Sequence, residues 1–101
     1  MEKKDKIILK LKKGEYSFRE MPEMKVLDVK LPLSDVREIM ADFDPTNDRG
    51  ITAVCGKIEK IDGDLDVFQM TNIRLGSLGS NDGQIDENAI ECSFYQMNYM
   101  Y

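Results

Sequence analysis

Apolar and polar residues alternate along the first part of the chain, which is typical of β-strands with one buried face. In Lys6–Lys12 one side of the pattern holds Ile7, Leu9 and Leu11, and the other side holds Lys10 and Lys12. Gly14 then favours a tight turn into Glu15–Glu20, and we expect these two runs to pair as a β-hairpin. Pro22 interrupts that pairing, and Met24–Leu31 follows as a third strand.

After Pro32 the spacing of the apolar residues changes to that of a helix. They recur at i, i+3, i+4 and i+7 over Val36–Phe43, which predicts an amphipathic helix of about three turns. Ser34 is a favourable N-cap, and Asp35 in the first turn suits the helix dipole. Pro45 and the polar residues after it end the helix.

The second half of the chain returns to strand patterns. Ile51–Ile61 is strand-like, and Gly56 within it indicates a bulge or a close approach of another segment. The pair Asp62 and Gly63 favours a hairpin turn, since both central residues of a type I′ turn need a positive φ. We expect Asp64–Leu75 to be the return strand.

The remaining residues complete the predicted fold. A short helical turn fits Gln84–Ile90, and Glu91–Tyr101 favours a last strand because it is rich in aromatic residues. The expected fold is a single α+β domain over residues 1–101, with residues 1–6 frayed. Its elements follow the order β-β-β-α-β-β-(α)-β, in a small antiparallel or mixed sheet with one principal amphipathic helix packed on it.

Composition narrows the classes of protein. The 101 residues are 42% hydrophobic and 33% charged, which fits a soluble folded domain. No run approaches the ~20 apolar residues that span a bilayer. The apolar run Ile7–Leu9 is too short for a secretory signal. We therefore expect a cytoplasmic protein that does not engage a membrane.

Candidate catalytic chemistry is sparse. The chain has no histidine, which removes the commonest general base and a usual zinc ligand. Cys55 and Cys92 are expected to be reduced thiols, and the sequence places no activating base beside either of them. We therefore expect no catalytic residues, no metal and no cofactor. An enzyme with this sequence would instead need a deep pocket with paired carboxylates.

Acidic residues gather in the later part of the chain. Residues 1–33 contain nine Lys/Arg and six Asp/Glu, a net +3, whereas residues 34–101 contain five and thirteen, a net −8. Glu38 and Asp42 are four residues apart, opposite the apolar stripe of the predicted helix, where they repel each other. We predict a partner-binding face made of Asp35, Glu38, Asp42, Asp44 and Asp48. The alternative is a face that is only solvated.

The aromatic C-terminal residues are a second candidate contact. Tyr95 and Tyr99 lie in the expected last strand, which at a sheet edge would offer a binding surface or a homodimer seam. The alternative is packing from both faces in the core. Direct binding of nucleic acid is not expected, because a pI near 4.7 opposes contact with phosphates.

The segment Leu31–Ile39, a strand that ends in Leu-Pro before a short capped helix, resembles the opening of small modules in ArdA-type antirestriction proteins. The strand-like Ile51–Ile61 follows in a similar place. Those proteins are acidic, come from mobile elements and imitate the charge of DNA. The resemblance therefore implies an accessory or counter-defence protein.

We favour a non-catalytic binding protein that inhibits or occludes a protein partner, such as a basic enzyme that acts on nucleic acid. The acidic later part of the chain and the sparse catalytic chemistry motivate this hypothesis. The alternative is a structural or assembly subunit of a phage or mobile element that oligomerises through its C-terminal strand.

Overall fold

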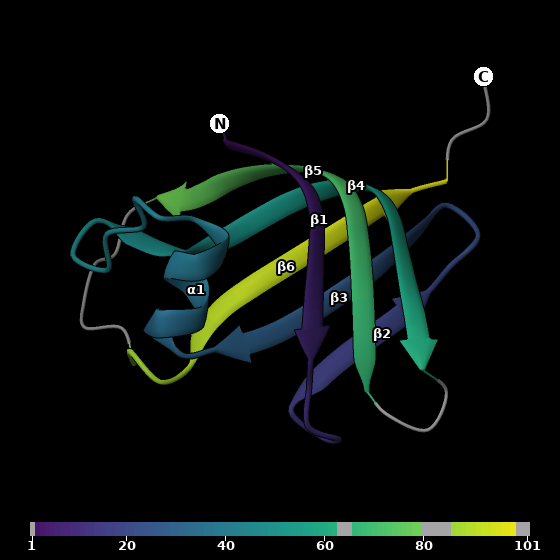
Figure 1. Ribbon diagram of the computed structural model, residues 1–101, viewed down its shortest axis with the longest axis horizontal. Coiled ribbons are helices and arrows are strands. Elements are labelled where there is room, and N and C mark those ends of the chain that lie inside the picture. The colour runs from purple at the N-terminus through teal and green to yellow at the C-terminus, as the bar shows by residue number, and fades with distance from the viewer. Residues whose placement is uncertain (1, 63–65, 80–85, 99–101) are drawn as a thin grey trace.

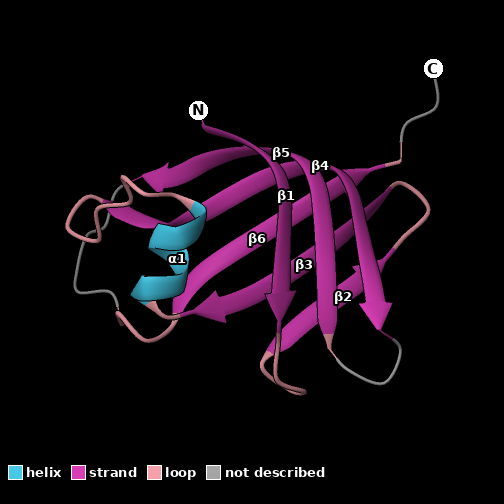
Figure 2. Ribbon diagram, in the orientation of Figure 1, coloured by secondary structure: helices cyan, strands magenta, loops and turns pink. Residues whose placement is uncertain are grey.

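The computed structural model describes residues 2–62, 66–79 and 86–98. It is mostly β, because 65% of the described residues lie in strands and 8% in a helix (Figure 2). The elements are β1 (Glu2–Lys10), β2 (Tyr16–Glu20), β3 (Met24–Leu31), α1 (Leu33–Ile39), β4 (Asp48–Asp62), β5 (Val67–Gly79) and β6 (Ile90–Met97). The predicted α+β fold with a principal helix packed on the sheet is wrong. The helix has only 7 residues, and about 10 Å of helix cannot cover such a sheet.

The described strands join one six-stranded sheet in the order β1-β5-β4-β6-β3-β2 (Figure 1). The pair β4–β6 is parallel, and the other pairs are antiparallel. The predicted hairpin of the first two strands is wrong, because β1 pairs with β5 and β2 with β3. Alternation shows which face of a strand is buried, but the choice of pairing partner depends on residues far away in the sequence.

The sheet curls over itself, so that the edge strand β2 packs near the other end of the sheet. Phe68 on β5 meets the rings of Tyr16 and Phe18 on β2 edge-on, with centroids 5.2 and 4.9 Å apart. In Figure 1, β1 and the adjoining parts of β5 and β4 run across β6, β3 and β2. In the link from β1 to β2, the backbone N–H of Leu11 donates to the carbonyl of Asp66. The core lies between the crossing parts of the sheet.

Where the sheet curls, the alternation of core-facing residues changes in β4 and β5. Met70 and Ile73 are both buried in the core although they are three residues apart, so the alternation skips a residue between them. Asn72 lies in this interval and has a φ of 52°, in the left-handed region. A Cβ on Gly56 of β4 would lie 2.9 Å from the Cβ of Asn72. The close approach predicted at Gly56 is therefore confirmed.

The helix is shorter than predicted and begins differently. It ends at Ile39, because Met40 has an extended backbone with a φ of −134°. Its N-cap is Pro32 rather than Ser34, and the carbonyl of Pro32 accepts the N–H of Val36. Met40 is nevertheless buried, so part of the apolar spacing serves a turn after the helix.

No helix in the described part of the chain is long and apolar enough to cross a membrane.

The two ends of the chain also take places that the sequence did not indicate. β1 begins at Glu2, so residues 2–6, predicted to fray, belong to a strand that pairs with β5. Residues 86–89 form a turn instead of the predicted helical turn, with the N–H of Ala89 donating to the carbonyl of Asp86. Residues 84 and 85 lie outside the described residues. β6 lies between β4 and β3 in the interior of the sheet.

Candidate functional site

A groove of about 440 Å³ runs beside β1, between this edge strand and α1. Its buried apolar lining comprises Ile7, Leu9, Leu31 and Ile39. Its other lining residues are Lys4, Lys6, Ile8 and Lys10 on β1, and Asp35 and Glu38 on α1. Among the described strands β1 pairs only with β5, so the backbone on its other side is available to a further strand.

The groove has a basic wall on β1 and an acidic wall on α1. The side chains of Lys6 and Lys10 are exposed, and so are those of Asp35 and Glu38. Within the described ranges no ion pair joins the two walls. Each wall therefore remains available to charged groups of a partner.

The structure divides the predicted acidic residues into two groups. Asp42 is exposed just after α1, near the acids of the helix in sequence. By contrast, Asp44 accepts hydrogen bonds from the N–H and the hydroxyl of Thr46, at 3.0 and 2.7 Å, and Asp48 accepts the N–H of Asp44 at 2.9 Å. The hydrogen bonds from Thr46, first of all that of its hydroxyl, lower the pKa of Asp44. Asp44 and Asp48 thus organise the link between α1 and β4.

Tyr95 belongs to a different surface. It is half-buried on the outer face of the sheet, where its register partners are Val26 of β3 and Val54 of β4. Val54 is 51% exposed, so Tyr95 and Val54 form a small apolar patch. Tyr99 lies outside the described residues. The structure therefore does not unite Tyr95 with the acids of α1.

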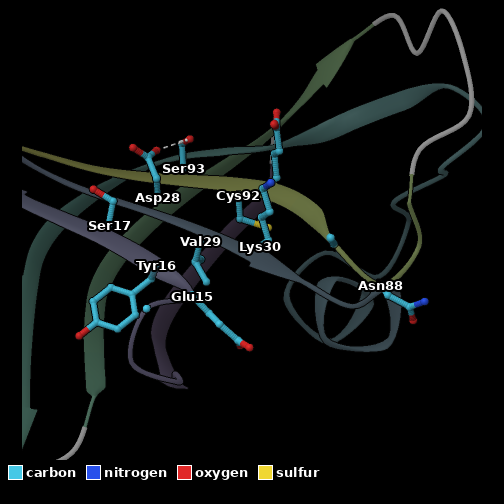
Figure 3. A pocket seen from close by; sticks show the side chains of 12 residues that line it. Glu15, Tyr16, Ser17, Asp28, Val29, Lys30, Asn88, Cys92 and Ser93 are labelled. Carbon is cyan, nitrogen blue, oxygen red and sulfur yellow. Dashed lines mark hydrogen bonds between the residues drawn. The ribbon is translucent and has the colours of Figure 1, made fainter.

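A second hollow, of about 700 Å³, lies where β2 begins beside β3 and β6 (Figure 3). The carboxylate of Asp28 accepts the hydroxyl of Ser93 at 2.7 Å and forms an ion pair with Arg19 at 3.0 Å. Both carboxylate oxygens of Asp28 are engaged in these contacts. Figure 3 shows the side chains of Glu15 and Asn88 pointing in different directions, so these two polar groups do not converge on one point.

The two thiols belong to the core. Cys55 and Cys92 are buried and not joined in a disulfide. Burial raises the pKa of both thiols to about 12. Near neutral pH they are therefore protonated, and a protonated thiol is a poor nucleophile.

Comparisons with protein-family models, with curated proteins and with solved structures found no match. The resemblance to ArdA-type antirestriction proteins therefore stays a prediction. In the part of the chain that the structure describes, no group of three or more His, Cys, Asp or Glu side chains is placed to hold a metal ion. The function is accordingly inferred from the groove beside β1.

The sequence did not reveal the residues of β1 that line this groove with the acids of α1. Alternation indicates that Lys10 lies on the exposed face of a strand, where a lysine is expected. It does not show that this strand is an edge or that a helix lies beside it. Ile8 is the residue that could have indicated a contact surface on this strand, because it is apolar at an outward position of the alternating pattern.

Proposed function

We propose that this chain is a small non-catalytic protein-binding domain, acting in the cytoplasm, that occludes a basic surface of a protein partner. The observation that supports it most is the acidic wall of the groove, where Asp35 and Glu38 are exposed on α1. Asp42 is exposed directly after the helix. An enzyme that acts on nucleic acid is a suitable partner, because such an enzyme carries basic side chains for phosphates.

The acidic wall would act mainly on the encounter with the partner. Exposed charges attract each other over about one Debye length, which is about 8 Å at physiological salt. Such attraction speeds association and disfavours partners of the wrong charge. We therefore expect binding that weakens as the salt concentration rises.

Two double variants of equal charge test this proposal. Glu38→Lys with Asp42→Lys reverses part of the acidic wall. Glu20→Lys with Glu23→Lys reverses two exposed acids at the β2–β3 turn, so the net charge changes equally. The unchanged chain is immobilised and a partner is isolated from a lysate of the native host. The affinity of that purified partner is then measured for all three chains at low and high salt.

We expect the first variant to bind about tenfold more weakly or worse, and the β2–β3 turn variant to bind within about twofold of the unchanged chain. The loss should shrink at high salt, because salt screens the lost attraction. Equal binding by all three chains at low salt would contradict the proposal.

The alternative, an assembly subunit joined through its last strand, gains no support from the position of β6. Both sides of β6 are paired, with β3 and with β4. The surface left for such an assembly is the patch of Tyr95 and Val54 on the outer face. Light scattering at micromolar concentration separates the two functions, since a stable monomer would contradict assembly.

A further inference from the structure

The free edge of β1 presents backbone hydrogen-bonding groups around Ile8. The N–H of Leu11 donates to the carbonyl of Asp66, which places Leu11 in a hydrogen-bonded pair beside β5. Such pairs alternate along an antiparallel ladder, so Ile7 and Leu9 also bond toward β5. The N–H and carbonyl of Ile8 therefore point to the free side, and the residue is 47% exposed.

We propose that the groove beside β1 takes up an extended segment of the protein partner as an additional β-strand. The proposal rests on the function proposed above and assigns the way in which the partner binds. By the same alternation, the backbone groups of Lys6 and Lys10 also face the free side. Main-chain hydrogen bonds to these residues supply affinity, and side chains at alternate positions supply specificity.

The exposed side chains of β1 define the chemistry of that segment. Lys6, Ile8 and Lys10 occupy alternate positions, so they share one face of the strand. Residues of an added strand directly opposite them would lie about 5 Å away. Acidic residues complement the two lysines, and an apolar residue complements Ile8. The segment therefore has the pattern acidic–x–apolar–x–acidic on this face.

The intervening residues of the segment face the side of the groove that α1 lines. Glu38 and Asp35 favour basic side chains there, which agrees with the basic partner of the proposed function. Leu31 and Ile39 belong to the buried apolar lining and favour short apolar side chains. The groove thus selects a strand that is acidic on one face and basic or apolar on the other.

A second copy of this chain is a poor occupant of the same edge. If two β1 strands paired antiparallel about Ile8, Lys6 of one copy would lie opposite Lys10 of the other. Pairing about Lys6 would bring two identical lysines together. Like charges directly opposite each other destabilise a strand pair.

The experiment uses a displayed library of random linear peptides, selected on the whole chain. The affinities of the enriched peptides are then measured by fluorescence anisotropy for Ile8→Pro and Glu20→Pro. Proline at position 8 removes the free-edge N–H without removing a ladder bond to β5. Glu20 is the matched control on the other edge. Met21 donates its N–H to Met24, so the N–H of Glu20 points to the free side of β2.

We expect enriched peptides with the acidic–x–apolar–x–acidic pattern. Ile8→Pro should weaken their binding about tenfold or more, and Glu20→Pro should leave it within about twofold. Thermal unfolding shows whether each variant is folded. If Ile8→Pro does not fold, Lys6→Glu with Lys10→Glu serves instead, and a new selection on it should enrich basic residues at the two acidic positions.

Three results would overturn strand addition. The selection could enrich no peptide, the affinity of the peptides could be unchanged by both sets of substitutions in β1, or two copies of the chain could pair through β1. None of them would by itself remove the proposed function. The Glu38→Lys, Asp42→Lys variant could fail to bind the natural partner while substitutions in β1 leave the affinity of the peptides unchanged. In that case the acidic wall binds the partner without an added strand.

Discussion

Gly56 and Asn72 approach each other so closely that a Cβ on Gly56 would lie 2.9 Å from the Cβ of Asn72. Asn72 has a φ of 52°, which favours Asn or Gly over other residues. The contact lies where the buried faces of β4 and β5 change their alternation. The absence of a side chain at Gly56 and the left-handed backbone at Asn72 together permit the sheet to curl over its core.

Gly56→Ala should lower the free energy of unfolding by about 1–3 kcal/mol, because the added methyl overpacks the bend. Asn72→Gly should restore part of that loss in the double variant, since it removes the atom that the methyl meets. Gly76→Ala is the control, with its nearest atom, Cγ2 of Thr52, 3.9 Å away. Urea unfolding of the unchanged chain, the single variants Gly56→Ala and Asn72→Gly, and the double variant measures the coupling. Strictly additive losses would show that the two positions do not interact.

The stability of the fold should depend on pH through Asp66. Tyr16 donates its hydroxyl to the Asp66 carboxylate, and Nζ of Lys60 lies 3.4 Å from it. The hydrogen bond from Tyr16, then Lys60, lowers the pKa of Asp66. A lowered folded pKa stabilises the fold above the unfolded value of about 3.9, and this stabilisation is lost as the pH falls through the folded pKa.

The pH dependence that Tyr16 contributes has the opposite sign to that of Asp66. The hydrogen bond to Asp66 raises the pKa of Tyr16, so its contribution is present below about pH 10 and is lost as the pH rises through the folded pKa. Tyr16→Phe should therefore lower stability at neutral pH and flatten the stability profile at both extremes. Urea unfolding at a series of pH values checks this, with Tyr95→Phe as control. Parallel profiles for Tyr16→Phe and the unchanged chain would refute it.

Both cysteines should be inert to thiol reagents in the folded protein. Burial raises their pKa to about 12, and the register places Cys92 opposite Ile51 and Cys55 opposite Gln96. Along the strands the two cysteines are therefore offset by four residues, or about 13 Å, which is too far for a disulfide. Labelling at about pH 8 should then be limited by unfolding and become complete in urea. Ser17→Cys supplies an exposed thiol as the positive control, and equally fast labelling of the native cysteines would contradict the prediction.

Substitution of Asp44 should affect the stability of the fold, whereas substitution of Asp42 should affect the binding of the partner. Asp44 accepts hydrogen bonds from Thr46 and also from Nδ2 of Asn47 at 3.0 Å, so Asp44→Ala should lower the unfolding temperature by a few degrees. Asp42 is exposed, so Asp42→Ala should leave that temperature unchanged but weaken binding of the partner. Calorimetry and partner titration measure the two effects. A stable Asp44→Ala chain would show that its turn does not need the carboxylate.

The candidate site was only partly predictable. The exposure of Glu38 follows from helical spacing, since it lies opposite the apolar stripe of α1. Asp42 is exposed as well, but it lies beyond the end of the helix. The role of Asp44 in a turn did not follow, because the predicted helix extended past the residue where α1 ends. The lysines of β1 could not be assigned to the site at all. Their place beside α1 depends on β1 pairing with β5, more than fifty residues later in the chain.

The sequence by itself determined where most strands lie, because alternation is a local property of a pleated backbone. It did not determine the buried residues throughout β4 and β5, where the alternation skips a residue. Met24–Leu31 is a strand with the predicted bounds. Only the tertiary structure decided that β1 is an edge, that β6 is interior, and that the helix stops after seven residues. Those outcomes depend on which distant segments bury their apolar faces against one another, and the pairing that buries the core overrides local preference.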